Sequence, residues 1–119
     1  MKILVVEDEP ILRENIAMLL EIEGHTVFQA ENGQVALNLL SADLHPDIVF
    51  TDIKMPHMTG LELIANLRAG NFPEYPIVIC SAYALSQDKE TAEKLGVHKY
   101  LTKPFSFDEI IKIVEEIPA

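Results

Sequence analysis

The sequence predicts an α/β protein in which a five-stranded parallel sheet lies between two layers of helices. Short apolar runs of four or five residues alternate along the chain with amphipathic helical patterns. Parallel strands need crossover connections, and these are right-handed, so a doubly wound three-layer sandwich is the economical arrangement. With 119 residues and no internal repeat or linker, residues 1–119 are expected to form one domain.

The apolar runs are rich in Val and Ile and are bounded by turn residues, which is typical of buried strands. For five such strands the common order is 2-1-3-4-5, the flavodoxin-like arrangement, with its switch point between the first and third strands. The crevice beyond the carboxyl ends of these two strands is therefore the predicted ligand site. We predict strands at residues 3–6, 26–30, 47–51, 77–80 and 97–101.

Start and stop signals place the helices between the strands. Pro10 suits a first helical turn, and Gly24 and Gly96 suit helix ends. Residues 59–62 and 106–109 have the spacing of capping boxes. Apolar residues that recur on one face should be buried. In the first, second, third and last helices these are Leu12, Ile16, Leu19 and Leu20; Val35, Ala36, Leu39 and Leu40; Leu63, Ile64 and Leu67; and Ile110, Ile111 and Val114.

Composition excludes several classes of function. Nine Lys and Arg against nineteen Asp and Glu give a formal net charge of −10, which argues against binding a phosphate backbone. No apolar run approaches the roughly 20 residues of a membrane span, and the first residues turn acidic too early for a signal peptide. The single cysteine, Cys80, has apolar neighbours and predicts a buried, inert thiol in a reducing compartment. We therefore expect a cytoplasmic protein.

Polar residues follow the central strands at the predicted edge. Glu7 and Asp8 follow the first strand, Asp52 the third, Ser81 the fourth and Lys103 the fifth. Two carboxylates about 4 Å apart repel each other by roughly 4 kcal/mol at an effective dielectric near 20, so such a site protonates or recruits a cation. All-oxygen ligation favours Mg²⁺. With an ammonium and a hydroxyl beside it, this is the apparatus of phosphoryl transfer, and Asp52 is the candidate nucleophile.

Each of these residues has an ordinary structural interpretation when it is taken alone. Asp52 fits a loop or a helix cap, and the acidic pair fits a cap of the first helix. Ser81 fits a turn, and Lys103 fits a solvated lysine. Their joint occurrence at the ends of successive strands favours a common site.

In this order and spacing, the chain resembles a response-regulator receiver domain of two-component signal transduction. The resemblance covers essentially all 119 residues. The features that carry it are Glu7-Asp8, Asp52 followed by Met55-Pro56 and Gly60, Ser81-Ala82, Tyr100, and Lys103-Pro104-Phe105.

The resemblance implies that Asp52 is the phosphoacceptor for a histidine kinase. It also implies that Glu7, Asp8, Asp52 and the backbone carbonyl of Lys54 arrange Mg²⁺ and its waters. The chain would then be a phosphoprotein switch of a phosphorelay. It would catalyse only its own phosphotransfer and autodephosphorylation, and so would not be a conventional enzyme.

The same resemblance assigns the residues around the phosphoryl group. Ser81 and Lys103 would hold its oxygens, helped by the backbone amides of Lys54 and Ala82, and the Lys103–Pro104 peptide would be cis. Ser81 stands where the commoner residue of the family is Thr, and the first acidic position holds Glu in place of the more usual Asp.

Tyr100 occupies the position of the family's aromatic switch. A phosphoryl group adds about −1.5 to −2 charges and attracts the Ser81 hydroxyl, which would give Tyr100 space to turn inward. The resemblance implies that this would reshape the face formed by the more polar fourth helix, which runs to Leu95, the strand at residues 97–101 and the last helix. Lys54 and Tyr83 lie two residues beyond Asp52 and Ser81. We hypothesise that they crowd the attacking water and set the phosphoryl lifetime.

The upstream partner implied is a histidine kinase or a phosphotransfer protein. The output is a downstream effector protein or a fused output domain, with no direct nucleic-acid binding and no membrane contact by this chain. We expect no effector domain after the fifth helix; a stand-alone protein and a domain of a longer regulator or hybrid kinase both stay open.

Two other functions are alternatives to the receiver domain. One is a phosphatase of the haloacid dehalogenase type, which is disfavoured because Lys54 stands in place of a second Asp. The other is an interaction module without phosphorylation.

Overall fold

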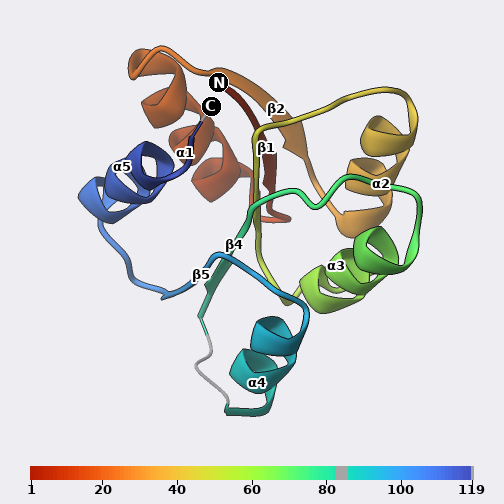
Figure 1. Cartoon of the computed structure of the whole chain (residues 1–119). Coiled ribbons are helices and arrows are strands. Elements are labelled where there is room, and N and C mark those ends of the chain that lie inside the picture. Colours follow the sequence, from red (N-terminus) through yellow and green to blue (C-terminus); the bar gives the residue numbers. More distant parts are fainter. Residues whose placement is uncertain (83–85, 119) are drawn as a thin grey trace.

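The residues that the structure describes, 1–82 and 86–118, form five parallel strands in one sheet and five connecting helices. In this computed structural model the strand order is β2-β1-β3-β4-β5 (Figure 1), which confirms the predicted fold class and order. The strands are β1 (Lys2–Val6), β2 (Thr26–Ala30), β3 (Ile48–Thr51), β4 (Ile77–Ser81) and β5 (Lys99–Thr102). The helices are α1 (Pro10–Ile22), α2 (Gly33–Ser41), α3 (Gly60–Ala69), α4 (Ser86–Lys94) and α5 (Phe107–Glu116).

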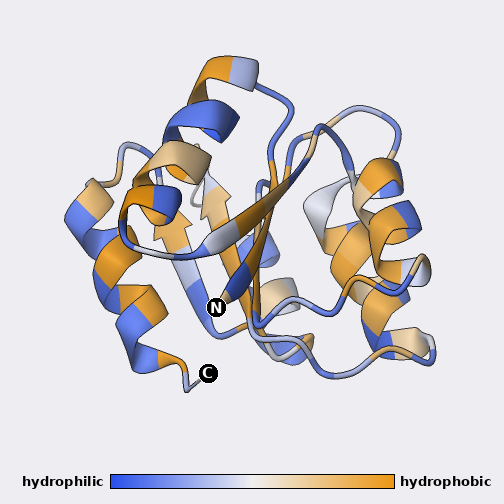
Figure 2. Ribbon diagram, turned by 90° about the horizontal axis from the view of Figure 1, so that it is seen from above, coloured by the Kyte–Doolittle hydropathy of each residue, from blue (hydrophilic) through white to orange (hydrophobic). Residues whose placement is uncertain are grey.

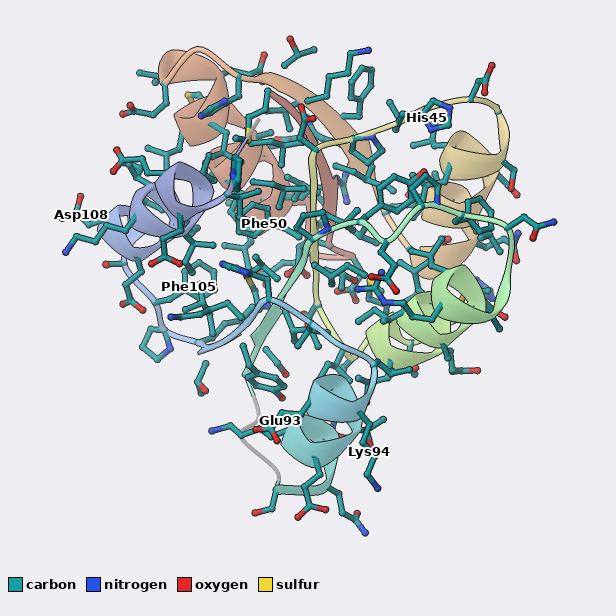
Figure 3. The ribbon with its side chains drawn as sticks, viewed as in Figure 1. His45, Phe50, Glu93, Lys94, Phe105 and Asp108 are labelled. Carbon is teal, nitrogen blue, oxygen red and sulfur yellow. The ribbon has the colours of Figure 1, made fainter. Side chains whose placement is uncertain are left out.

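Two hydrophobic layers enclose the sheet. Helices α1 and α5 cover one face, and α2, α3 and α4 cover the other (Figure 1). Along β3, Ile48 and Phe50 pack into the layer toward α1 and α5, whereas Val49 packs into the opposite layer. Figure 3 labels Phe50 in this position, and Figure 2 shows the apolar bands of the helices. Because successive side chains of a strand point to opposite faces, a central strand that is buried on both faces has a continuous apolar sequence.

Two strand boundaries differ from the predicted ones in a way that concerns the site. Strand β5 begins at Lys99 and runs to Thr102, whereas we predicted residues 97–101. The amide of Val97 donates to the carbonyl of Ala92 at 3.2 Å, so Val97 closes the turn that follows α4 and is not part of the strand. Strand β4 extends to Ser81, which pairs with Thr102 in the ladder. The backbone of Ser81 is therefore part of the sheet.

The predicted helix ends are confirmed, but five residues of the predicted buried faces are only half-buried: Leu12, Leu19, Val35, Leu39 and Ile111. Thr59 and Ser106 form capping boxes with Glu62 and Glu109, and Gly24, which follows the C-cap residue of α1, has a positive φ of 93°. On α5 the buried face includes Ile113, while Ile111 is only half-buried. The buried residues of α5 thus follow the i, i+3, i+4 spacing of a helix face.

One side of the molecule keeps large apolar side chains in contact with solvent. Among the described residues these are Ile11, Met18 and Ile22 on α1 and Phe107 at the start of α5. Their gathering on two neighbouring helices is typical of a surface that binds another protein. Within the described ranges, no helix has the length and apolarity that a membrane crossing needs.

Gly60 lets the first turn of α3 approach the end of β3. Its amide donates to the carbonyl of Ile53 at 2.9 Å. A Cβ atom at this position would collide with the backbone carbonyl oxygen of Asp52. The absence of a side chain therefore allows α3 to begin directly beneath Asp52.

We predict that Gly60→Ala lowers the free energy of unfolding by more than about 2 kcal/mol, because the added methyl group meets rigid backbone. Gly33→Ala is the comparison variant, since Gly33 also begins a helix but its Cβ would lie 3.0 Å from Met58 Cβ and Cγ and 3.1 Å from the Met58 carbonyl oxygen, a much milder contact that a small shift relieves. Urea unfolding of both variants checks the prediction. Equal losses of stability in the two variants would contradict it.

Candidate functional site

The carboxyl ends of four strands bring the predicted site residues to one edge of the sheet. Glu7 and Asp8 directly follow β1, and Asp52 directly follows β3. Ser81 is the last residue of β4, and Lys103 directly follows β5. All five therefore lie where we predicted, at the edge at which open parallel sheets bind ligands.

Three carboxylates meet at this edge. One oxygen each of Glu7, Asp8 and Asp52 lies within 4.8 Å of the other two. Glu7 is 3% exposed and Asp52 is 7% exposed, whereas Asp8 is exposed to solvent. Carboxylate oxygens that converge from two strands onto one point are suited to holding a hard cation. The described residues therefore contain a group that could bind a metal ion.

Lys103 joins the two buried carboxylates. Its Nζ atom lies 2.9 Å from Glu7 Oε1 and 2.9 Å from Asp52 Oδ2. Burial alone would lower the pKa of Lys103, but the hydrogen bonds and the charges of Asp52 and Glu7 outweigh it and raise the pKa. The ammonium group therefore stays charged and offsets part of the repulsion between the carboxylates. This double ion pair was not part of the sequence prediction.

Backbone amides hold both buried carboxylates in place by hydrogen bonds. The Ile53 amide donates to Asp52 Oδ1 at 2.6 Å, and the Glu9 amide donates to Glu7 Oε2 at 3.1 Å. The Arg13 guanidinium, which sequence analysis did not single out, donates to the Glu7 carbonyl at 2.8 Å. These bonds orient the carboxylates toward the edge of the sheet.

The structure does not support the capping interpretations of the acidic residues. The N-cap of α1 is Glu9, which makes no side-chain capping bond, and the N-cap of α3 is Thr59. Helix capping therefore does not explain the positions of Glu7, Asp8 and Asp52.

Burial raises the pKa of Glu7 to about 7, and the neighbouring Asp8 and Asp52 add to the rise. Hydrogen bonds from Lys103 and from the Glu9 amide oppose it. Glu7 therefore exchanges a proton near neutral pH, where a bound cation would compete with that proton.

Ser81 and Tyr100 form the second part of the site. Ser81 is 1% exposed, and its side chain hydrogen-bonds to the hydroxyl of the half-buried Tyr100. Burial raises the pKa of Tyr100, and this hydrogen bond works in the opposite direction. The backbone amide of Lys103 donates to the Ser81 carbonyl at 2.6 Å. The hydroxyl, the phenol and the ammonium group thus belong to neighbouring strands.

The remaining predicted residues lie around this centre. Lys54 and Ala82 are exposed at the edge of the site, and Tyr83 lies outside the described residues. The Lys103–Pro104 peptide is cis, as the resemblance implied. Cys80 is buried, and burial raises the pKa of its thiol to about 12, which fits the inert thiol that we predicted.

Together, the fold and the site define a class of protein: a doubly wound domain that gathers carboxylates, a hydroxyl and an ammonium group at the carboxyl edge of its sheet. The family model for the response regulator receiver domain matches residues 3–115. The chain belongs to this family.

Similar proteins agree with this assignment. A probable transcriptional regulatory protein of Picosynechococcus sp. is 43% identical over 117 residues, which cover 92% of this chain and 46% of that protein. The chain thus spans less than half the length of this relative. The receiver domain of the Francisella response regulator 1452 is 34% identical, with a TM-score of 0.89 and coverage of 98% of this chain and 94% of that one. The response regulator protein TrrA from Thermotoga maritima, in complex with Mg²⁺ and BeF, is 32% identical, with a TM-score of 0.86 and 98% coverage of both chains.

The raised pKa of Glu7 predicts that stability depends on pH in metal-free buffer. Between the ordinary pKa of 4.5 and about 7, the folded protein binds more protons at Glu7 than the unfolded chain does. The free energy of unfolding should therefore fall as the pH rises through this range. Glu7→Gln keeps an oxygen acceptor for Lys103 but removes this dependence, so its stability relative to wild type should rise by on the order of 2 kcal/mol from pH 4.5 to pH 8.

Urea unfolding in the presence of a chelator, at both pH values, measures this difference. Glu14→Gln, which removes an exposed carboxylate of α1, is the matched control and should parallel wild type. Parallel pH dependence of wild type and Glu7→Gln would contradict the prediction. Added Mg²⁺ should stabilise wild type at pH 8 and stabilise Glu7→Gln much less, because metal binding requires the ionised carboxylate.

Proposed function

We propose that the chain is a phosphorylation-dependent signalling switch, in which Asp52 accepts a phosphoryl group from the phosphohistidine of a histidine kinase or a phosphotransfer protein. One observation carries the proposal. The Asp52 carboxylate lies buried at the carboxyl end of β3, beside two further carboxylates and 2.9 Å from the ammonium group of Lys103. A carboxylate held in this way can attack phosphorus, while the charges around it neutralise the transferred group.

In the proposed transfer, one bond forms and one breaks. An oxygen of Asp52 bonds to phosphorus, the P–N bond of the phosphohistidine breaks, and the donor histidine keeps the electron pair and takes up a proton. The ammonium group of Lys103, the Ser81 hydroxyl and the backbone amides of Lys54 and Ala82 would donate to the phosphoryl oxygens. The chain then catalyses only its own phosphorylation and autodephosphorylation, and is not a conventional enzyme.

Mg²⁺ is the cation that this group of oxygens fits best. Glu7, Asp8, Asp52 and the backbone carbonyl of Lys54 would supply hard oxygen ligands, with waters and phosphoryl oxygens completing the shell. When bound, Mg²⁺ neutralises negative charge on the phosphoryl group and on the carboxylates. The Mg²⁺ named with the TrrA structure supports this choice.

The Ser81–Tyr100 hydrogen bond suggests how the signal leaves the site. A phosphoryl group on Asp52 would attract the Ser81 hydroxyl and compete with Tyr100 for it. Tyr100 would then change position, and with it the surface formed by α4, β5 and α5. In this proposal Ser81 and Tyr100 are the switch residues.

The partners in this proposal are proteins. The phosphodonor lies upstream, and a downstream effector protein or a fused output domain receives the signal. The exposed apolar side chains of α1 and Phe107 support protein binding, and the net charge of −10 argues against direct nucleic-acid binding. We place the protein in the cytoplasm, in keeping with its single buried thiol.

Incubation with acetyl phosphate and Mg²⁺ is expected to add the mass of one phosphoryl group to the wild-type chain. Asp52→Asn should abolish the gain, because an amide is too weak a nucleophile to replace the carboxylate. Asp47→Asn is a matched control, since Asp47 is an acidic residue at the opposite end of β3, and it should be phosphorylated like wild type. Intact-protein mass spectrometry gives the readout.

Other outcomes of this assay would favour other functions. If wild type gains no mass, the chain is an interaction module that keeps the fold without the chemistry. If it releases phosphate over many turnovers from unrelated phosphomonoesters, it is a phosphatase, although Lys54 stands where such an enzyme of the haloacid dehalogenase type has a second Asp.

Lys54→Ala is expected to shorten the lifetime of the phosphorylated protein severalfold, because the exposed Lys54 side chain would no longer crowd the water that attacks phosphorus. The decay of the added mass after removal of acetyl phosphate measures this lifetime. Lys2→Ala, at the other end of the sheet, is the control. An unchanged decay rate in Lys54→Ala would remove the assignment of this side chain to lifetime control.

A further inference from the structure

Helix α4 is held to the rest of the described structure by few contacts. Ala92 is its buried residue, and most of its side chains are polar and exposed. Figure 3 labels Glu93 and Lys94 on two sides of the helix, and both residues are exposed. A helix with so little buried apolar area depends on the polar contacts at its two ends for its position.

The C-terminal end of α4 is fixed by Arg68 of α3. The Arg68 Nε atom donates to the carbonyl of Leu95 at 2.9 Å. Its Nη2 atom donates to the carbonyl of Tyr75 at 3.1 Å and reaches that of Gly96 at 3.4 Å. The carbonyls that follow α4 are therefore tied to α3 and to the segment before β4.

The other half of α4 contacts Tyr100 through Lys89. The Lys89 Nζ atom lies over the Tyr100 ring, 5.6 Å from its centroid, which is the geometry of a cation–π interaction. Both residues line a cavity of about 260 Å³ between α4 and β5. Tyr100 is thus held at two points: its hydroxyl by Ser81 and its ring face by Lys89.

We propose that Lys89 is a positioning residue of the switch, which holds the Tyr100 ring in the place where its hydroxyl bonds to Ser81. This inference rests on the proposed function. It adds a residue on α4 that favours the unphosphorylated arrangement and links any change of Tyr100 to the position of α4. With the C-terminal end fixed by Arg68, the end of α4 near Lys89 is the one that can respond.

The direction of the effect follows from linkage. A ligand that draws the Ser81 hydroxyl away from Tyr100 works against every contact that keeps Tyr100 in its present place. Loss of the Lys89 charge should therefore favour the arrangement with ligand bound. An exposed cation–π contact is strong enough to change the ratio of two arrangements by about two- to fivefold.

The experiment compares four forms of the full chain: wild type, Lys89→Met, Lys89→Arg and Lys94→Met. Met keeps the length of the side chain without its charge, and Arg keeps the cation. Lys94→Met removes a charge from the last turn of the same helix and controls for net charge. The first readout is the NMR signals of the Tyr100 ring in the unphosphorylated protein, assigned with Tyr100→Phe.

The second readout is the beryllium fluoride concentration that half-saturates the protein in the presence of Mg²⁺. We expect Lys89→Met to shift the Tyr100 ring signals and to lower the half-saturating concentration about two- to fivefold. Lys89→Arg and Lys94→Met should stay close to wild type in both readouts.

The two readouts separate failure of the inference from failure of the proposed function. Unchanged ring signals in Lys89→Met overturn the inference, whether or not the chain is phosphorylated. Shifted signals with an unchanged half-saturating concentration show that the contact places the ring without biasing the switch, and also overturn it. If wild type neither binds beryllium fluoride nor gains mass from acetyl phosphate, the proposed function fails and the switch role of Lys89 fails with it.

Discussion

The ion pairs of Lys103 with Glu7 and Asp52 are the interaction on which the site depends. The sheet places the ends of β1 and β3 side by side, because these strands pair in parallel from Ile3 opposite Ile48 to Val6 opposite Thr51. The same pairing forces Glu7 and Asp52 together in a region that is almost closed to water. Without a cation, two ionised carboxylates there would repel each other strongly. Lys103 supplies one positive charge from β5, and the raised pKa of Glu7 shows that this charge does not offset burial and repulsion completely.

This incomplete compensation connects stability with function. Burial of Glu7, which raises its pKa to about 7, therefore costs stability once the carboxyl is ionised. In the proposed function this residual cost would favour a proton or Mg²⁺ at the site, because either one relieves the repulsion between the carboxylates. The backbone bonds to Asp52 and Glu7 from Ile53 and Glu9 keep the carboxylates in place while these ligands change.

Sequence patterns were sufficient to predict the sheet and the edge on which the site lies, since both follow from apolar periodicity and from the polar residue after each strand. They could not predict features set by contacts between elements. Val97 was predicted to be a strand residue, but its amide donates to the carbonyl of Ala92 and closes the turn after α4. Ile111 and Ile113 are both apolar, and only the packing of α5 decides which is buried. The sequence of the pair Glu7-Asp8 also does not show that the carboxylate of Glu7 is buried and that of Asp8 exposed. The bridge formed by Lys103 joins residues 96 positions apart, and local pattern carries no information on it.

The backbone hydrogen bond from Lys103 to Ser81 has a further consequence. The two groups proposed to hold phosphoryl oxygens come from adjacent strands whose backbones are locked together at this point. The spacing of their two backbones is therefore governed by the strand spacing of the sheet, about 4.8 Å, and not by the length or conformation of a loop. The main chain that carries both groups is thereby held by the ladder, so that adjustment to a bound anion would fall to the two side chains. The sheet thus sets the points from which both side chains start.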